Sequence, residues 1–203
     1  MKSVKNVYEQ QYTTYRFKGI WNTVFGEPET NGAWLIWGSE KNGKTWFALM
    51  LAKMISGLVR TLYISAEEGL GKNFRDAMKR AGIDDSDRNL RLMEYLPLEH
   101  LEELLEKRRA PKVILIDNIT VYNETLMYGK FHDLLRKNDD KIFIFLAHEE
   151  NKQPYTSTAK MCRRLAKVIV HVKGLKAFVS GRCPGGAIEI TSDKAQLCWG
   201  VQK

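Results

Sequence analysis

Short runs of apolar residues alternate along the chain with longer stretches in which apolar residues recur every three or four positions. The runs at 33–37, 61–65, 113–116 and 142–146 have the length and the β-branched and aromatic content of strands. Two of them, 113–116 and 142–146, are continuously apolar, as expected for central strands of a parallel sheet with helices on both faces. The pattern predicts an α/β domain.

The stretches between these runs predict amphipathic helices. A helix from Lys44 to Gly57 follows the first strand, and Gly82 and Pro111 are expected to end the second and third helices. The apolar faces of the second, third and fourth helices consist of Leu70, Phe74, Ala77, Met78 and Ala81; of Leu98, Leu101, Leu104 and Leu105; and of Leu126, Met127, Phe131, Leu134 and Leu135.

The pattern of apolar residues changes near Lys167, where short strand-like runs follow one another with brief turns between them. These runs predict an antiparallel extension at the edge of the sheet, and they lie at 168–172, 177–180, 187–191 and 196–199. The sequence therefore predicts one domain over residues 1–203, with a lead-in segment at 1–30 and a β-hairpin extension at 167–200.

Composition narrows the class of protein. The chain has 203 residues, 44% hydrophobic and 28% charged, which suits a single soluble domain. A net charge of +8 favours acidic partners such as nucleic acid or nucleotides, although dispersed basic residues are equally typical of a solvated surface. No apolar run reaches the length of a membrane helix, and three scattered cysteines fit reduced thiols. These features predict a cytoplasmic protein without a membrane partner.

The strongest chemical signal is a glycine-rich loop after the first strand. The loop reads Gly38-Ser39-Glu40-Lys41-Asn42-Gly43-Lys44-Thr45 and continues into the expected helix at Trp46. It fits GxxxxGK[ST], a match that arises by chance on the order of once in a hundred chains of this length. In such a loop backbone N–H groups surround phosphate oxygens, with Lys44 on the β- and γ-phosphates and Thr45 on Mg²⁺. The alternative is a fortuitous glycine turn with an exposed lysine.

Acidic residues follow two of the predicted strands. Asp117 ends the run 113–116, where it could hold the water shell of Mg²⁺ or merely cap the next turn. Glu67 and Glu68 follow the run 61–65, and one of them could polarise a water that attacks the γ-phosphate. They could equally favour the start of the following helix.

The phosphate loop, the strand that ends at Asp117 and the segment Leu62-Tyr63-Ile64-Ser65-Ala66-Glu67-Glu68 together resemble the RecA-like ATPase core. The resemblance is to the branch with RadA/Sms, the DnaB-type helicase motor and KaiC, in a minimal single-domain form as in phage or mobile-element ATPases. It implies a doubly wound, mainly parallel sheet and the cofactors ATP and Mg²⁺. By position, it makes Glu67 the catalytic glutamate.

The resemblance implies three further features. Phe145-Leu146-Ala147-His148 is similar to the fourth core strand, so His148 would sense the γ-phosphate; a solvent or capping histidine is the alternative. Residues 149–158 fall where relatives carry a mobile loop that contacts DNA. Arg182 lies where relatives present a finger to the neighbouring subunit, although the accompanying lysine is missing and a surface arginine fits as well.

The resemblance implies an oligomeric ATP hydrolase, a ring or a filament, that acts on single-stranded or double-stranded DNA in replication or recombination. A helicase-loader or regulatory ATPase, which binds a replication protein and uses the nucleotide as a switch, is the alternative. A small-molecule phosphotransferase is disfavoured because no arginine-rich lid with a nucleoside-binding acid follows the loop.

Overall fold

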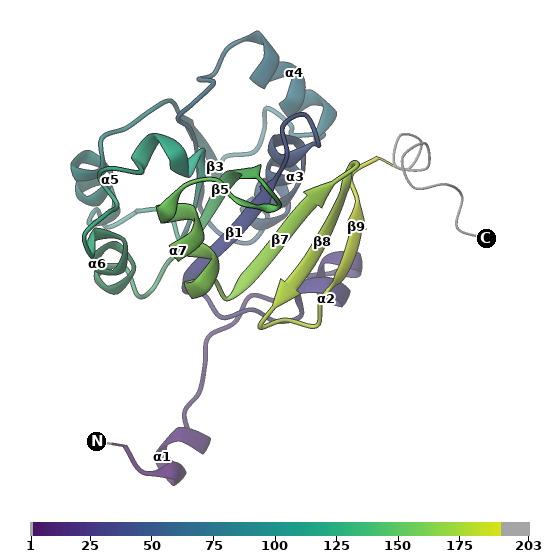
Figure 1. The fold of residues 1–203 in the computed structure, drawn as a ribbon. Coiled ribbons are helices and arrows are strands. Elements are labelled where there is room, and N and C mark those ends of the chain that lie inside the picture. Colours follow the sequence, from purple (N-terminus) through teal and green to yellow (C-terminus); the bar gives the residue numbers. More distant parts are fainter. Residues whose placement is uncertain (1, 192–203) are drawn as a thin grey trace.

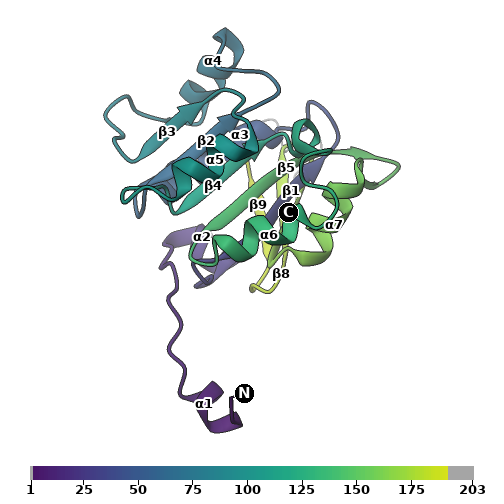
Figure 2. The same cartoon turned by 90° about the vertical axis from the view of Figure 1, so that its left-hand side faces the viewer.

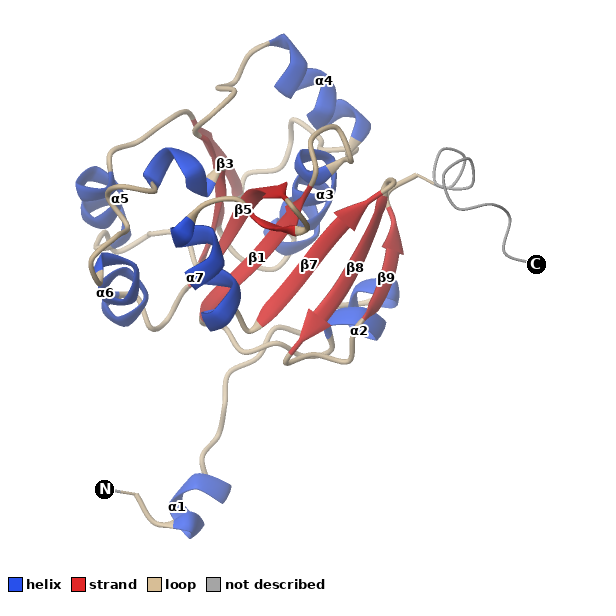
Figure 3. Ribbon diagram, in the orientation of Figure 1, coloured by secondary structure: helices blue, strands red, loops and turns tan. Residues whose placement is uncertain are grey.

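The apolar runs form the inner strands of a nine-stranded sheet (Figures 1 and 3). The computed structural model describes residues 2–191. The strand order is β3-β2-β4-β5-β1-β7-β8-β9, with β6 paired to β5 outside this path. The strands are β1 (Gly32–Gly38), β2 (Thr61–Ser65), β3 (Leu90–Met93), β4 (Val113–Asp117), β5 (Ile142–Glu150), β6 (Gln153–Pro154), β7 (Val168–Lys173), β8 (Lys176–Gly181) and β9 (Gly186–Glu189).

The sheet is parallel from β3 to β7 and antiparallel from β7 to β9. The predicted doubly wound α/β fold with an antiparallel C-terminal extension is therefore confirmed. The expected strand at 196–199 lies outside the described residues. Because β1, β2, β4 and β5 run in the same direction, the loops that follow them meet at one edge of the sheet.

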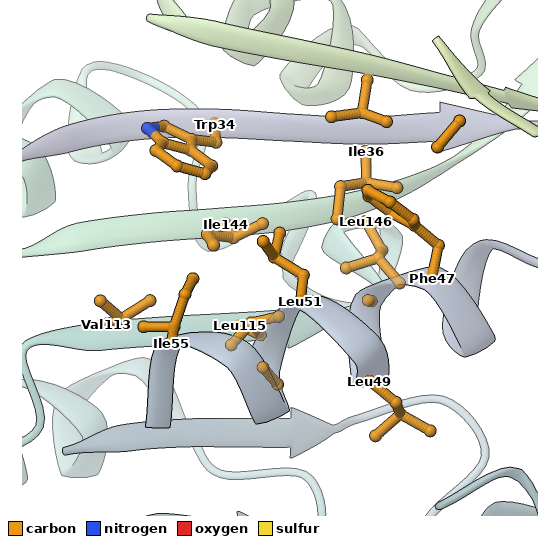
Figure 4. Packing of buried hydrophobic residues seen from close by; sticks show 14 of the residues in the cluster. Trp34, Ile36, Phe47, Leu49, Leu51, Ile55, Val113, Leu115, Ile144 and Leu146 are labelled. Atoms are coloured by element: carbon orange, nitrogen blue, oxygen red, sulfur yellow. The ribbon is translucent and has the colours of Figure 1, made fainter. Parts of the chain in front are cut away.

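Helices cover both faces of the sheet (Figure 2). Alternate residues of each strand point to opposite faces, and each face has its own apolar core. On one face α3 packs against β1, β4 and β5, with Leu51 and Ile55 beside Leu115 and Ile144 (Figure 4). The helices are α1 (Val4–Tyr8), α2 (Gly19–Phe25), α3 (Lys44–Ser56), α4 (Lys72–Arg80), α5 (Leu98–Leu105), α6 (Lys130–Lys137), α7 (Ser157–Leu165) and the 3₁₀ helix η1 (Ile119–Tyr122).

Helix boundaries are where the sequence prediction fails. The third predicted helix, α5, ends at Leu105 instead of reaching Pro111, because the apolar face stops there. The fourth, α6, begins only at Lys130. Gly129, directly before it, has a left-handed φ of 88°, so a helix cannot continue through this residue. Leu70 likewise lies in the loop before α4. Among the described residues, no helix is long and apolar enough to span a bilayer.

The segment 149–158, expected to be a mobile loop, has regular structure. Strand β5 continues to Glu150 and turns back through the short antiparallel strand β6, and α7 begins at Ser157 with Thr156 as its N-cap. The expectation of a loop is wrong because β5 continues to Glu150 through polar residues, so the apolar run that predicts the strand ends too early. The strand β3 and the helix α7 were also not predicted as elements.

Candidate active site

The phosphate loop joins the carboxyl end of β1 to the amino end of α3. Gly43 is the N-cap of α3 with a left-handed φ of 95°, and no side chain caps the helix. The turn between β7 and β8 contacts the loop: the backbone N–H of Gly174 donates a hydrogen bond of 2.8 Å to Asn42 Oδ1. The left-handed φ of Gly43 favours glycine at this position, and a Cβ there would also lie 2.9 Å from the end of the Leu175 side chain. The first N–H groups of α3 are thus available to an anion.

Lys44 lies inside this loop. Its residue exposure is 8%, and its Nζ donates to the carbonyl oxygen of Ser39 at 3.0 Å. Burial lowers the pKa of the Lys44 ammonium, although Asp117 and other nearby carboxylates act to raise that pKa. A cation held among backbone amides is the arrangement that binds a phosphate chain.

Thr45 and Asp117 meet at the base of the loop. The Thr45 hydroxyl donates to Asp117 Oδ2 at 3.0 Å, and the Tyr63 hydroxyl donates to the same oxygen at 2.7 Å. Burial raises the pKa of the Asp117 carboxyl, while the two hydroxyl donors act to lower it. Hydroxyl and carboxylate oxygens are ligands that suit Mg²⁺, so this pair fits the metal of a bound nucleotide.

Tyr63 was not among the predicted site residues. It lies in the middle of β2 and is fully buried, and its burial and the neighbouring Asp117 hold the pKa of its hydroxyl well above the ordinary value. The sequence offered one signal, since a tyrosine inside a buried strand needs a partner for its hydroxyl.

We expect Asp117→Asn to raise the melting temperature of the nucleotide-free protein by a few degrees at neutral pH. The substitution removes a buried carboxylate whose folded pKa is raised. A raised folded pKa means that the wild type loses stability as the pH rises through that pKa, so the gain should vanish toward pH ~4, the ordinary value. Thermal melts across this range measure the difference.

Asp140→Asn is the control with the opposite sign. Lys112 and Lys141 lower the pKa of Asp140 to about 2, so this carboxylate stabilises the fold above its ordinary pKa. Its removal should lower the melting temperature at neutral pH and matter less in acid. A wild type and an Asp117→Asn variant with equal melting temperatures at pH ~7 would contradict the prediction.

The predicted glutamate and the predicted sensor histidine are in direct contact. Glu67 Oε2 lies 3.1 Å from His148 Nε2 and accepts a hydrogen bond of 3.1 Å from the Asn118 side-chain amide. Asn118 is buried at the end of β4, next to Asp117, and was missed by the sequence analysis. The Glu67 side chain is still 46% exposed, which leaves it accessible to water.

A cavity of about 630 Å³ that opens to solvent connects the phosphate loop with Asp117, Glu67 and His148. This volume is in the range of small-molecule sites. Trp46 and Arg80 lie on its wall, with the guanidinium 5.6 Å from the centre of the indole ring. The remaining lining residues are Glu40, Lys41, Gly43, Lys44, Thr45, Glu67, Glu68, Asn73, Ala77, Asp117, His148 and Leu175.

Arg182 lies far from its own phosphate loop. It follows β8, and its backbone N–H donates to the carbonyl of Lys167, directly before β7. β7 starts beside Trp34, near the beginning of β1, whereas the loop follows the end of β1. Arg182 is therefore exposed at the opposite edge of the sheet and cannot reach the loop of its own chain.

Glu149, which the family resemblance places in a DNA-contacting loop, instead packs beside the phosphate loop. Its carboxylate is 3.0 Å from His171 Nε2 and 3.3 Å from the Ser39 hydroxyl. His171 in turn stacks on Trp37, with ring centres 4.1 Å apart. The Glu149 carboxylate thus helps to hold Ser39, and with it the phosphate loop, in position.

Comparisons with known proteins agree with this architecture. The family model iSTAND, described as inactive STAND, matches residues 8–147. A KaiC-like protein from the hyperthermophilic archaeon Pyrococcus horikoshii is 16% identical, with a TM-score of 0.60, over 85% of this chain and 88% of that one. The flagellar accessory protein FlaH from Methanocaldococcus jannaschii is 17% identical, with a TM-score of 0.57, over 79% and 85%. No curated protein matches the chain. At these identities the likeness shows the RecA-like fold.

Proposed function

This chain belongs to the iSTAND (inactive STAND) family, and we propose that it binds ATP with Mg²⁺ at its phosphate loop and hydrolyses it slowly. The observation that carries the proposal is the 3.0 Å contact between Thr45 and Asp117 beside a buried Lys44. Lys44 and Thr45 begin the helix after β1 and Asp117 ends β4, and the parallel sheet brings β1 and β4 together on either side of β5.

Each residue has a role in the proposal. The uncapped amino end of α3 and Lys44 would hold the phosphates, and Thr45 and Asp117 would hold the metal. Mg²⁺ would neutralise charge on the phosphate oxygens. Glu67 would accept a proton from the attacking water, and His148 would respond to the presence of the γ-phosphate.

The alternative is a regulatory switch that binds ATP and a partner protein without turnover. Two observations favour it. The family is described as inactive, and both His148 and Asn118 hydrogen-bond the Glu67 carboxylate that would serve as base. These two contacts occupy Oε2 of Glu67, one of the two oxygens that could accept a proton from the attacking water.

Calorimetry with ATP, with and without Mg²⁺, combined with a phosphate-release assay, tests the proposal. We expect binding that strengthens with Mg²⁺ and a slow release of phosphate. Binding without any release would support the regulatory switch, and an absence of binding would refute both.

We also propose that the protein acts on DNA as an oligomer, with Arg182 of one subunit facing the nucleotide of the next. The net charge of +8 supports a polyanionic partner. A residue at the edge opposite its own loop can serve only a neighbouring subunit, in a head-to-tail assembly.

Subunit mixing tests this arrangement. Arg182→Ala should lower turnover by about 10³–10⁵-fold, the range for fingers supplied in trans. An equal mixture of Lys44→Ala and Arg182→Ala subunits should recover up to about a quarter of wild-type turnover, because that fraction of interfaces pairs an intact loop with an intact finger. Wild-type turnover that is independent of protein concentration, from a monomer by native mass, would exclude the trans role.

A further inference from the structure

A second cleft lies at the edge of the sheet opposite the phosphate loop. Its volume is about 700 Å³. It lies between the starts of β2 and β3 and the segment from Leu104 to Pro111 that leads into β4. Figure 2 shows β3 at the border of the sheet with β2 and α5 beside it. Because the strands are parallel, this cleft and the nucleotide site are at opposite ends of the same strands.

The cleft is lined by cations without matching acids. Its charged lining residues are Arg60, Arg88, Arg91, Lys107 and Arg109, and no acidic residue of the described part of the chain lines it. All five cations are exposed, and within residues 2–191 none of them forms an ion pair. Such a concentration of cations in a concave site attracts polyanions.

The nearest acid along the chain, on the β3 side, is already engaged. Asp87 accepts hydrogen bonds from the Ser56 hydroxyl and from the backbone N–H groups of Asn89 and Leu90. Arg60 is held in place by donating to the carbonyl oxygen of Arg109 at 3.2 Å. Asp87 and Glu106, which precede Arg88 and Lys107 in the chain, are not among the lining residues, so the charges on the described wall of the cleft are all positive.

Apolar side chains line the cleft between the cations. Leu62 is buried, and Leu92, Met93, Leu104 and Pro111 are half-buried. A ligand with regularly spaced negative charges and flat apolar faces complements both the cations and the apolar side chains of the cleft. A single-stranded nucleic acid has phosphates for the cations and exposed bases for the apolar surface, whereas a duplex hides its base faces.

We propose that this cleft binds single-stranded nucleic acid through Arg60, Arg88, Arg91, Lys107 and Arg109. The inference deepens the proposed action on DNA and rests on it for its biological purpose. It moves the contact from residues 149–158, which the family resemblance implies, to the opposite edge of the sheet. The nucleotide site is left free for ATP while the strand is bound.

The test uses a fluorescein-labelled oligothymidine of about 20 nucleotides, longer than the ~4–16 that a small domain covers. Fluorescence anisotropy with the full chain should show binding whose log K falls with log salt at a slope of about −2 to −3.5, for three to five phosphate contacts. The triple variant Arg88→Gln/Arg91→Gln/Lys107→Gln should bind at least about 10-fold more weakly, with a slope shallower by about 2. Arg60 is left intact because it contacts the backbone of Arg109.

A second triple variant, Lys152→Gln/Lys160→Gln/Arg164→Gln, is the matched control. It removes the same charge from exposed positions around β6 and α7, the region that the resemblance implicates. It should bind the oligonucleotide within about threefold of the wild type, since all five cations of the cleft remain. Equal melting temperatures of the two triples and the wild type verify folding.

Three results would overturn the inference: a larger loss in the second triple, equal losses in both, or no binding by the wild type. Displacement of the oligonucleotide by polyglutamate at equal charge concentration would also overturn it, in favour of an acidic protein partner. Calorimetry with Mg·ATP separates this inference from the nucleotide proposal. Binding of DNA at the cleft without any binding of ATP would refute the nucleotide proposal alone, and the converse would refute the cleft alone.

Discussion

Replacing Lys44 by alanine should weaken Mg·ATP binding by at least about 100-fold, to below the detection limit of calorimetry. Lys44 is a buried residue with 8% exposure, and its ammonium donates to the Ser39 carbonyl oxygen at 3.0 Å, where water cannot replace it readily. Hydrogen bonds from a charged donor contribute about 1.5–3 kcal/mol each, and the loss of one or two of them accounts for this factor.

Lys41→Asn provides the matched control. Lys41 belongs to the same loop and carries the same charge, but its side chain is exposed and its φ is 58°, a conformation that asparagine tolerates. This variant should bind Mg·ATP within about threefold of the wild type, because a solvated charge contributes little. Similar losses in both variants would mean that net charge, and not the position of Lys44, controls binding.

Glu67→Gln should retain ATP binding and lower the rate of phosphate release by about 10²–10⁴-fold, the usual effect of losing general-base assistance. Glutamine keeps the shape of the side chain and can still accept a hydrogen bond from Asn118, so the fold around His148 should persist. Single-turnover phosphate release with a saturating concentration of Mg·ATP measures the change.

Glu68→Gln separates the two candidate bases. Glu68 lines the same cavity and is one residue further along, but Glu67 is the one in contact with His148. We expect Glu68→Gln to release phosphate within about threefold of the wild type, as for a loss of charge alone. A large loss in Glu68→Gln together with near-normal release in Glu67→Gln would transfer the catalytic role to Glu68.

The two residues that contact Glu67 give a further comparison between hydrolase and switch. If Asn118 and His148 hold the base in an unreactive arrangement, then breaking one contact should raise phosphate release. His148→Ala is the simpler variant, since Asn118 is buried and also caps η1 through Thr120. Lower release in His148→Ala would instead support its role as a sensor of the γ-phosphate.

Features that depend on neighbouring residues could be predicted before the fold was known. The phosphate loop, the strand runs and the carboxylate of Asp117 were found because strand periodicity and the GxxxxGK[ST] spacing are local properties. Helix ends were predicted less well, because the end of α5 at Leu105 depends on where packing stops and α6 begins only after the left-handed residue Gly129.

Which of these residues lie in contact depends on how the strands assemble into the sheet. The meeting of Tyr63 with Asp117, the contact of Glu67 with His148 and Asn118, and the remoteness of Arg182 depend on strand order, which a single sequence does not specify. The same holds for the basic cleft, whose cations come from segments separated by up to 49 positions between Arg60 and Arg109. Parallel pairing of β2, β3 and β4 brings these segments to one edge, so the site exists only once the sheet has formed.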